Sequence, residues 1–552
     1  MINCTGYIFD LIKRLKIDDL NYNKIVEFQK ENNCSFEDAL IDLGYIKEDE
    51  MLHLLQDISS FNVIDLNEVD LKEDVFISIP TELVIEYKIL PIELSEGEFK
   101  IASYTLKSIS SFEAIKVLTK KQARLYLCKR SEFLRLYHTY FIPKRIKSLS
   151  DQILNNNFIG KEINNFDSPI IDLVENILET AVIYNSSDIH IEPMLKSFRI
   201  RYRIDGELVE LFNFPIKIFP FIIGRLKILS QLDISEKRLP QDGRIVKNIL
   251  GILVDFRVST IPTIHGEKMV IRVLKKSNIN LDRLELGFKK DEEIIIKRLM
   301  NCNRGLILIS GPTGSGKTTT LYSLLNDLNR DSRNIVTIED PVEYMIEGIN
   351  QININTKIGL DFSTCLKSVL RQDPDIIMVG EIRDSETAKI AVRAAITGHL
   401  VLSTIHTNDS ASAFLRLIDM GVEPYLVCEA IKGIIAQRLV RRICTRCKTE
   451  YIATNLEKQL LGVNKDEKVV LYKGTGCRDC QGTGYKGRMG VFEILEIDRE
   501  LRDMIIYNLN IDILRDLCIN KGMKTLKKSC RELVLSGVTT VEEMIKNTFN
   551  YD

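Results

Sequence analysis

The sequence predicts an α/β protein whose second half is an open sheet covered by helices. An apolar run at 306–309 is followed by a glycine-rich segment at 311–318 and by residues with helical spacing at 319–325. Two later apolar runs, at 334–338 and 375–379, each lead into acidic residues. A strand, loop and helix in this order, with polar residues at the ends of further strands, are typical of a sheet that binds ligands at one edge.

The glycine-rich segment fits the phosphate-binding pattern G-x-x-x-x-G-K-[ST]. Its residues are Gly311, Pro312, Thr313, Gly314, Ser315, Gly316, Lys317 and Thr318, followed by Thr319. Glycines let backbone N–H groups surround phosphate oxygens, and the start of the following helix adds partial positive charge. We expect Lys317 to reach the β- and γ-phosphates of a nucleoside triphosphate and the Thr318 hydroxyl to hold Mg²⁺. The alternative is a glycine-rich turn that fits the pattern by chance.

The composition of the whole chain is that of an ordinary globular protein. Hydrophobic residues make up 45% and charged residues 28% of the chain, as in soluble globular proteins. The length of 552 residues predicts three or four domains. Lysine and arginine number 75 against 77 acidic residues, a net charge of −2, so no general positive field favours nucleic acid. The sequence has no apolar run of about 18 residues and no basic-then-apolar start. We therefore expect a cytoplasmic protein without a transmembrane helix or signal peptide.

An amino-terminal domain over 1–140 is predicted to be mainly helical. Its first apolar residues recur at helical spacing, and one short strand is expected near 89–92. Residues 141–165 are polar and rich in asparagine, with few large apolar side chains, and we interpret them as a flexible linker.

Residues 166–280 form a predicted α+β domain with aligned arginines. His190 lies in a run of alternating apolar and polar residues, and a second such run ends in an Asp-Gly turn. The second run places Arg199, Arg201 and Arg203 on one side of a strand. Either this is the basic outer face of a half-buried sheet, or the arginines complete a phosphate site on the same or a neighbouring chain. For the set as a whole we favour the second interpretation.

The last domain, 281–552, has further candidate site residues next to its strands. Glu343 follows one apolar strand, at the phosphate side of an open α/β sheet. Glu381 follows another, where an acid suits coordination of Mg²⁺ directly or through water. His399 and His406 bracket a third strand. A lone histidine is usually structural, but two around one strand are candidates for sensing the γ-phosphate.

Four of the twelve cysteines form two tight pairs, Cys444-x-x-Cys447 and Cys477-x-x-Cys480, in an insert at about 440–490. Four thiolates at this spacing suit tetrahedral Zn²⁺, and a full set of four protein ligands predicts a structural rather than a catalytic metal. A redox-active pair or a chance arrangement is the alternative. We interpret the other eight cysteines as small apolar residues.

The phosphate loop and the segments 337–343, 380–384 and 398–406 together resemble the four nucleotide boxes of the type II/type IV secretion ATPase superfamily. The resemblance covers nearly the whole chain. It implies a RecA-like P-loop NTPase motor domain, preceded by a small α+β (PAS-like) domain and the mainly helical amino-terminal domain. It also implies a homo-hexameric ring that hydrolyses ATP, with each active site at a subunit boundary.

The resemblance further implies catalytic roles for particular residues. They are Arg201, Arg203, Glu343, Arg371, Glu381, His399 and His406. In this scheme Glu343 orients or polarises the attacking water, and Glu381 lies beside Mg²⁺. The two histidines act as a pair, and Arg371 matches an arginine important for activity in the family. The arginines of the α+β domain close the site.

The amino-terminal domain resembles that of secretion and pilus-assembly ATPases, and in some relatives this domain binds cyclic di-GMP. Their pattern places Arg-Leu-Gly where this chain has Cys34-Ser35-Phe36, although Leu43-Gly44 and Leu54-Leu55-Gln56 match later parts of it. The missing guanidinium removes a group that could stack on or pair with guanine. We therefore favour docking of a membrane partner over cyclic di-GMP binding here.

The resemblance leads to a functional expectation. We expect a cytoplasmic hexameric ATPase, peripherally associated with the inner face of the cytoplasmic membrane, that powers type IV pilus assembly. Its expected partners are an inner-membrane platform protein and a cytoplasmic docking protein of the pilus machine. The tetracysteine insert favours extension and type II secretion ATPases over the family's retraction ATPases. The type II secretion ATPase is the alternative; a docking protein with negligible turnover and a nucleic-acid motor are further hypotheses.

Overall fold

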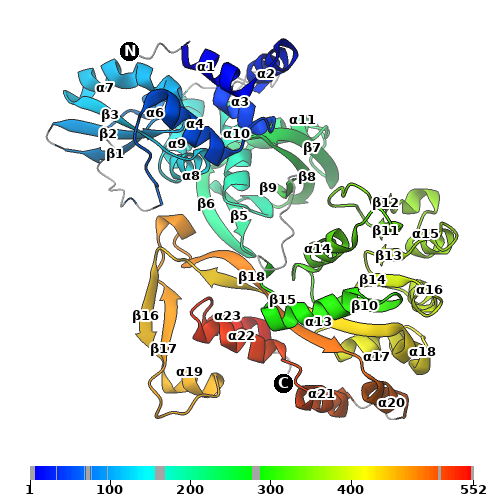
Figure 1. The fold of residues 1–552 in the computed structure, drawn as a ribbon. Helices are drawn as coiled ribbons and strands as arrows, with labels where there is room; N and C mark the ends of the chain where they lie inside the picture. Colours follow the sequence, from blue (N-terminus) through cyan, green and yellow to red (C-terminus); the bar gives the residue numbers. More distant parts are fainter. Residues whose placement is uncertain are drawn as a thin grey trace. The chain divides into compact units, whose positions relative to one another are not determined.

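The computed structural model describes residues 6–32, 34–67, 69, 75, 78–95, 97–155, 168–275, 286–507 and 511–548. None of the helices in these ranges combines the length and apolar character needed to cross a bilayer. The chain divides into two compact units, Met1–Ser277 and Asn278–Asp552 (Figure 1).

The first unit begins with a helical cluster and a small sheet. The helices are α1 (Gly6–Leu15), α2 (Asp19–Asn32), α3 (Phe36–Asp42), α4 (Glu48–Ser59), α6 (Thr81–Tyr87), η1 (Leu106–Ser111), α7 (Phe112–Thr119) and α8 (Arg130–Tyr140). The strands are β1 (Leu90–Leu94), β2 (Glu98–Ser103) and β3 (Gln122–Leu127). β1 and β2 are antiparallel, whereas β2 and β3 are parallel. The strand predicted near 89–92 is confirmed, but it belongs to a three-stranded sheet that the sequence pattern did not reveal.

Most of the predicted flexible linker is a helix, so this interpretation was wrong. α9 (Ile142–Asn155) packs on α10 (Ser168–Ile183), and its apolar residues are buried in the core that the two helices share. These residues are Ile142, Ile146, Leu149 and Ile153. Every third or fourth residue is apolar, which is a helical pattern, but the asparagine-rich stretch that follows obscured it. Residues 156–165 lie outside the described residues.

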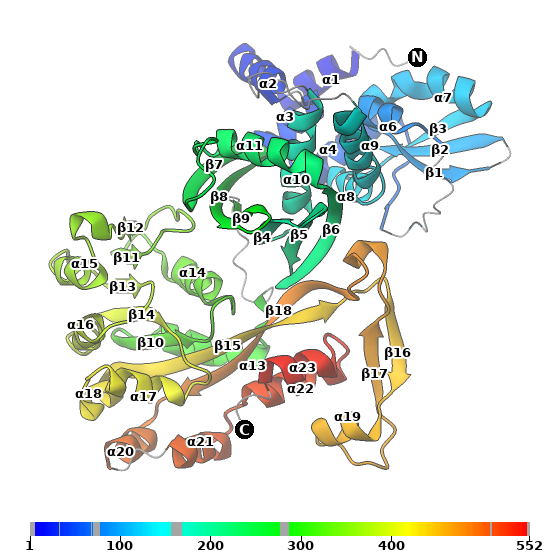
Figure 2. The ribbon, with the colours of Figure 1, turned by 180° about the vertical axis from the view of Figure 1, so that it is seen from behind.

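The second part of this unit is a six-stranded antiparallel sheet in the order β6-β5-β4-β9-β8-β7. Its strands are β4 (Asp188–Pro193), β5 (Ser197–Ile204), β6 (Glu207–Pro215), β7 (Gln241–Ile249), β8 (Ile252–Thr263) and β9 (Gly266–Lys275). One face packs against α9, α10, η2 (Ile216–Ile218) and α11 (Phe219–Leu229) (Figure 2). Buried and half-buried residues alternate along β5, so Arg199, Arg201 and Arg203 share its outer face, as predicted.

The second unit is built on a seven-stranded sheet in the order β12-β11-β13-β14-β10-β15-β18. The strands are β10 (Gly305–Ser310), β11 (Ile335–Glu339), β12 (Asn350–Asn353), β13 (Ile376–Val379), β14 (Leu400–Ile405), β15 (Ile431–Ile443) and β18 (Tyr485–Glu496). All neighbours are parallel except β15 and β18. The predicted α/β sheet is thus confirmed, and the carboxyl ends of β10, β11, β13 and β14 lie at one edge.

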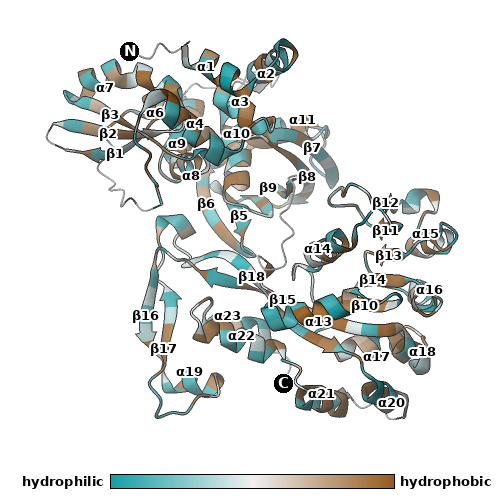
Figure 3. Cartoon of the chain, in the orientation of Figure 1, coloured by the Kyte–Doolittle hydropathy of each residue, from teal (hydrophilic) through white to brown (hydrophobic). Residues whose placement is uncertain are grey.

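Helices cover both faces of this sheet. They are α13 (Lys290–Met300), α14 (Lys317–Leu328), α15 (Phe362–Val369), α16 (Ser385–Ile396), α17 (Ser412–Asp419), α18 (Pro424–Ala430), α20 (Arg499–Tyr507) and α21 (Ile511–Asn520), while the short η3 (Thr356–Ile358) is exposed. α13 and α14 share one core with the sheet, and α15 to α18 with α20 and α21 share the other. α13 carries both hydrophilic and hydrophobic residues, and it buries Ile296, Leu299 and Met300 on one side, as expected of an amphipathic helix (Figure 3).

β15 and β18 form a long hairpin that carries the cysteine insert. The elements between them are β16 (Lys448–Ile452), α19 (Asn455–Leu460), β17 (Val470–Gly474) and η4 (Arg478–Cys480). The closing helices, α22 (Leu526–Leu535) and α23 (Val541–Thr548), pack with the hairpin and the insert in one core. The same strand, β15, therefore runs from the central sheet to the insert.

Candidate nucleotide site

The phosphate loop joins β10 to α14 at the carboxyl edge of the sheet. Gly311, Gly314 and Gly316 have φ angles of 151°, 79° and 87°, which favour glycine. A Cβ atom at Gly311 would lie 2.6 Å from the carbonyl oxygen of Gln437, and one at Gly316 would lie 2.9 Å from the Gln437 amide nitrogen. At Gly311 the close backbone contact excludes any side chain, and at Gly314 and Gly316 the positive φ angles favour glycine. Pro312 and Thr313 form its exposed part.

The loop has the features of an anion site. The Ser315 hydroxyl is buried and has no hydrogen-bond partner among the described residues. Lys317 begins α14, and its Nζ atom donates to the carbonyl oxygens of Gly311 at 2.8 Å and Pro312 at 2.9 Å. Burial lowers the pKa of Lys317 to about 8. A buried cation, an unpaired hydroxyl and the N–H groups at the start of a helix together fit a phosphate.

The first turn of α14 carries the other two predicted ligands. Thr318 and Thr319 are half-buried there, directly after Lys317, whereas the next residue, Thr320, is buried. Thr320 donates its hydroxyl hydrogen to Oε1 of Gln437 at 2.8 Å. The role of Thr318 as a Mg²⁺ ligand stays a prediction.

Glu381 and His406 lie together beside the phosphate loop. The register pairs Ser310 with Ile405, so β10 and β14 end side by side. The Glu381 carboxylate lies 2.5 Å from Nε of Arg383 and 3.6 Å from Nε2 of His406. Burial and the positive charges of Lys317 and Arg383 lower the pKa of His406, which Glu381 opposes. This shift favours the neutral imidazole, which has one donor and one acceptor nitrogen.

The two glutamates after β11 differ in environment. Glu339 is buried and accepts hydrogen bonds from the Tyr322 hydroxyl, from Thr337 Oγ1 at 2.6 Å and from Gln351 Nε2 at 3.2 Å. Glu343 is exposed at the same carboxyl edge of the sheet as the phosphate loop. Only the second is placed to meet a ligand outside the core.

His399 and Arg371 lie at the opposite edge of the sheet. The carbonyl of His399 accepts a hydrogen bond from the N–H of Gly305 at 3.0 Å, where β10 begins, and its Nδ1 atom lies 3.0 Å from the Ala394 carbonyl. Arg371 precedes β13 and donates to the Lys367 carbonyl at 2.8 Å. Six residues of β14, roughly 20 Å, separate His399 from the phosphate edge. Within one chain, the expected histidine pair is therefore not brought together.

The arginines of the six-stranded sheet belong to the first unit and are engaged there. Arg201 donates to the Glu192 carboxylate at 2.8 Å. Nε of Arg203 lies 3.4 Å from the carboxylate of Asp188, and its Nη1 donates to the Gly206 carbonyl at 3.0 Å. Their predicted part in closing the nucleotide site stays a prediction.

Three buried residues of the β15–β18 hairpin also shape the site, and no motif marked them. Gln437 touches two glycines of the phosphate loop, as given above. Arg438 donates through Nη2 to the Asn408 carbonyl at 2.7 Å. Glu493 accepts from the backbone N–H of Ser410 at 3.0 Å and from its hydroxyl. Arg438 and Glu493 thereby hold the segment that follows His406.

The four cysteines of the insert are brought together as predicted. Their Sγ atoms all lie within 4.8 Å of one another, and no other group of three or more histidine, cysteine or acidic ligands is found in the described part of the chain. Cys444 and Cys477, like Cys447 and Cys480, are 3.8 Å apart at sulfur. A tetrahedral zinc with Zn–S bonds of about 2.3 Å requires a separation of about 3.8 Å. The geometry fits zinc.

Two family models and several known proteins match this chain. A family model described as type II/IV secretion system protein matches residues 164–546, and an MshEN domain model matches residues 59–145. The chain is 39% identical to the type IV pilus assembly ATPase PilB of Myxococcus xanthus over 98% of each protein. It is 42% identical to the type II secretion system protein E of Pseudomonas aeruginosa, over 73% of this chain and 80% of the relative.

A solved structure has a fold similar to that of this chain. The ATPase DotB of Legionella pneumophila aligns with 70% of this chain and 97% of its own, with a TM-score of 0.51 and 20% identity. The phosphate loop lies within the long family match, and the alignment to the pilus ATPase is nearly full-length on both sides. This chain belongs to the type II/IV secretion system protein family.

Proposed function

We propose that this chain is an ATP hydrolase that works as a homo-hexamer and powers assembly of a type IV pilus. The observation that carries this proposal is the alignment to a pilus assembly ATPase over 98% of both chains. The type II secretion relative is matched over 73% of this chain. The pilus relative thus accounts for the amino-terminal part as well as for the nucleotide site.

The geometry of the loop supports ATP as the nucleotide ligand. In this proposal Lys317 exchanges its two carbonyl contacts for phosphate oxygens, and the Ser315 hydroxyl gains a partner. Thr318 and Glu381 would hold Mg²⁺, which neutralises phosphate charge when bound. Glu343, exposed at the same edge of the sheet, would orient the attacking water.

The proposed division of labour follows the predicted domains. Residues 281–552 form the ATPase domain, 166–280 supply Arg201 and Arg203 to a phosphate site, and 1–140 dock or regulate. In a hexamer, those arginines would act on their own chain's site or a neighbour's. Arg371 and His399 lie away from the phosphate loop of their own chain. They could take part in ATP hydrolysis only by contact with the nucleotide site of another subunit.

The insert and the partners complete the proposal. Four cysteinate ligands leave no open position, so zinc would hold the insert together rather than take part in hydrolysis. We propose that the hexamer works at the cytoplasmic face of the inner membrane, with a platform protein and a docking protein of the pilus machine.

Type II secretion is the second candidate function, because the identity to the type II relative is 42% over the shared part. Deleting the gene in its own host separates the two. The pilus proposal expects surface pili to disappear, protein export to continue, and the wild-type gene but not Lys317→Ala to restore pili. Intact pili with lost export would replace it with the type II proposal.

A further inference from the structure

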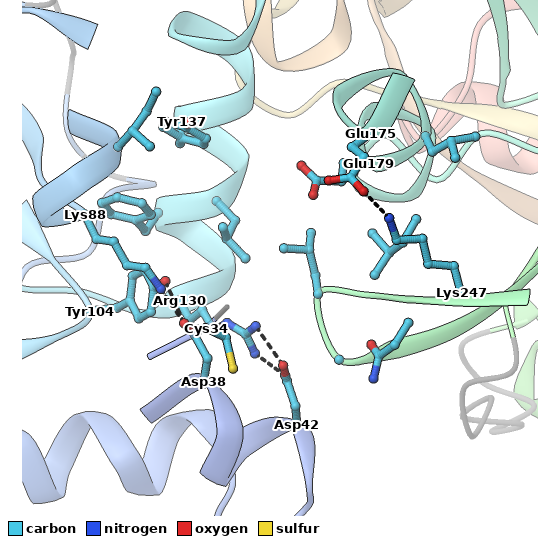
Figure 4. Close-up of a pocket in the computed structure, with 18 of the residues that line it drawn as sticks. Cys34, Asp38, Asp42, Lys88, Tyr104, Arg130, Tyr137, Glu175, Glu179 and Lys247 are labelled. Carbon is cyan, nitrogen blue, oxygen red and sulfur yellow. Dashed lines mark hydrogen bonds and ion pairs between the residues drawn. The ribbon is translucent and has the colours of Figure 1, made fainter. Parts of the chain in front are cut away.

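A pocket of about 440 Å³ lies within the first unit, between its amino-terminal part and its six-stranded sheet. The walls come from α3, α6 and α8 on one side and from α10 and the β7–β8 hairpin on the other (Figure 4). This volume lies in the range of small-molecule sites. Nothing in the proposed ATPase cycle uses this pocket.

On the first wall, every charge has an opposite partner. Asp38 pairs with Lys88 and, at 2.7 Å, with Nε of Arg130. Arg130 also donates through Nη1 and Nη2 to the carboxylate of Asp42. All four side chains are largely buried, so this wall is an internally neutral cluster.

On the second wall, one carboxyl group is left over. Lys247 donates to Glu175 at 2.5 Å. The neighbouring Glu179 has no hydrogen bond or ion pair among the described residues, and its carboxyl group points into the space between α10 and α8 (Figure 4). Arg145, which also faces Glu179, is engaged by Asp172 at 3.3 Å. The pocket thus has four carboxyl groups against three cationic side chains.

The unpaired group is in an environment that disfavours an isolated charge. Burial, followed by the charge of Glu175, raises the pKa of Glu179 to about 7. A carboxylate in such a place is stabilised by a proton or by a cation that enters the pocket.

The surroundings favour an organic cation over a metal ion. In the described part of the chain, the pocket's acids do not form a group of three ligand atoms close enough to share a metal. Hard cations need several oxygen ligands. Beside Glu179 lies the ring of Tyr137, which stacks on Phe133 with 6.2 Å between centroids, and Phe28 adds a further ring. An unpaired carboxylate near aromatic rings is suited to a flat or short cation with N–H donors.

We propose that this pocket binds a small organic cation, an amine, amidine or guanidinium, through the Glu179 carboxylate. The ligand would touch α8 and α10 at once. Its binding would therefore stabilise the contact between the amino-terminal part and the sheet within this unit.

Benzamidine, a flat cation with two N–H donor groups, tests the proposal on the full chain, with benzamide as its neutral isostere. By titration calorimetry at pH 8, benzamidine should bind and benzamide should bind at least about tenfold more weakly. Glu179→Gln keeps the shape of the side chain and should weaken benzamidine binding about tenfold or more. Glu113→Gln, at an exposed position on α7, is the matched control and should leave it unchanged.

The pH dependence adds a readout that a merely structural glutamate would not give. Because the proton competes with the ligand, benzamidine affinity should fall about tenfold per pH unit below about 7 in the wild type and stay flat in Glu179→Gln. The melting temperature of the variant without ligand confirms that it folds. Failure of benzamidine to bind, equal binding of benzamide, or undiminished binding by Glu179→Gln would overturn the proposal. None of these outcomes depends on ATP turnover.

Discussion

Arg438→Met is the sharpest test of how the β15–β18 hairpin supports the nucleotide site. Arg438 is 4% exposed, and its guanidinium donates to the carbonyl oxygens of Asn408 at 2.7 Å and Gln437 at 3.1 Å. Asn408 lies two residues after His406, which in turn lies near Glu381. Methionine retains the length and apolar packing of the arginine stem but cannot donate to either carbonyl.

The expected cost follows from these contacts. A hydrogen bond from a charged group contributes about 1.5–3 kcal/mol, and removing the buried charge returns part of its desolvation cost. We therefore expect a net loss of roughly one such bond, about 1.5–3 kcal/mol. Expressed in the transition state, this lowers kcat between about tenfold and a hundredfold. KM for ATP should change less, because the phosphate loop itself is intact.

The assay is steady-state ATP hydrolysis, with urea unfolding to follow stability. Arg442→Met is the matched control, since Arg442 is an exposed residue of the same strand, and its kcat should stay within about twofold of the wild type. Unchanged kcat in Arg438→Met, with Arg442→Met behaving alike, would refute the support that we assign to the hairpin.

Two further predictions concern the lysine and the zinc insert. Burial lowers the pKa of Lys317 from 10.5 to about 8, so the unfolded chain binds more protons between these values and stability rises with pH there. Lys317→Met should therefore abolish ATP binding and lose the rise in melting temperature that the nucleotide-free wild type shows between about pH 8 and 10.5; an equal rise in the variant would contradict this. Cys447→Ser should reduce bound zinc from about one per chain to nearly none and expose the insert to protease, as should chelation of the wild type. Full zinc content in the variant, measured by atomic spectroscopy, would be the opposing result.

Sequence patterns predicted those parts of the structure that depend on residues close together in the chain. The phosphate loop, the strands before Glu381 and His406, and the four cysteines each depend on residues close in the chain or on a fixed spacing. The paired histidines show the limit of such patterns. His399 and His406 bracket the six-residue strand β14, so they lie at opposite edges of the sheet, and their spacing alone argued against a pair within one chain.

Contacts between segments that are distant in the chain could not be predicted from sequence patterns. Gln437 meets the phosphate loop more than a hundred residues after Gly316, and Glu493 meets Ser410 across 83 residues. Neither contact has a local signal. The helix α9 was predicted wrongly although its sequence does contain a local signal. Its buried residues Ile142, Ile146, Leu149 and Ile153 recur at helical spacing, and this spacing could have predicted the helix.

ATP turnover by the purified chain, measured together with its mass in solution, tests the central claim most directly. We predict hydrolysis by a hexamer, and a fall of at least about a hundredfold in kcat for Glu343→Gln with ATP binding retained. A monomer that binds ATP without turnover, unaltered by Glu343→Gln, would contradict it and leave a nucleotide-gated docking protein in its place.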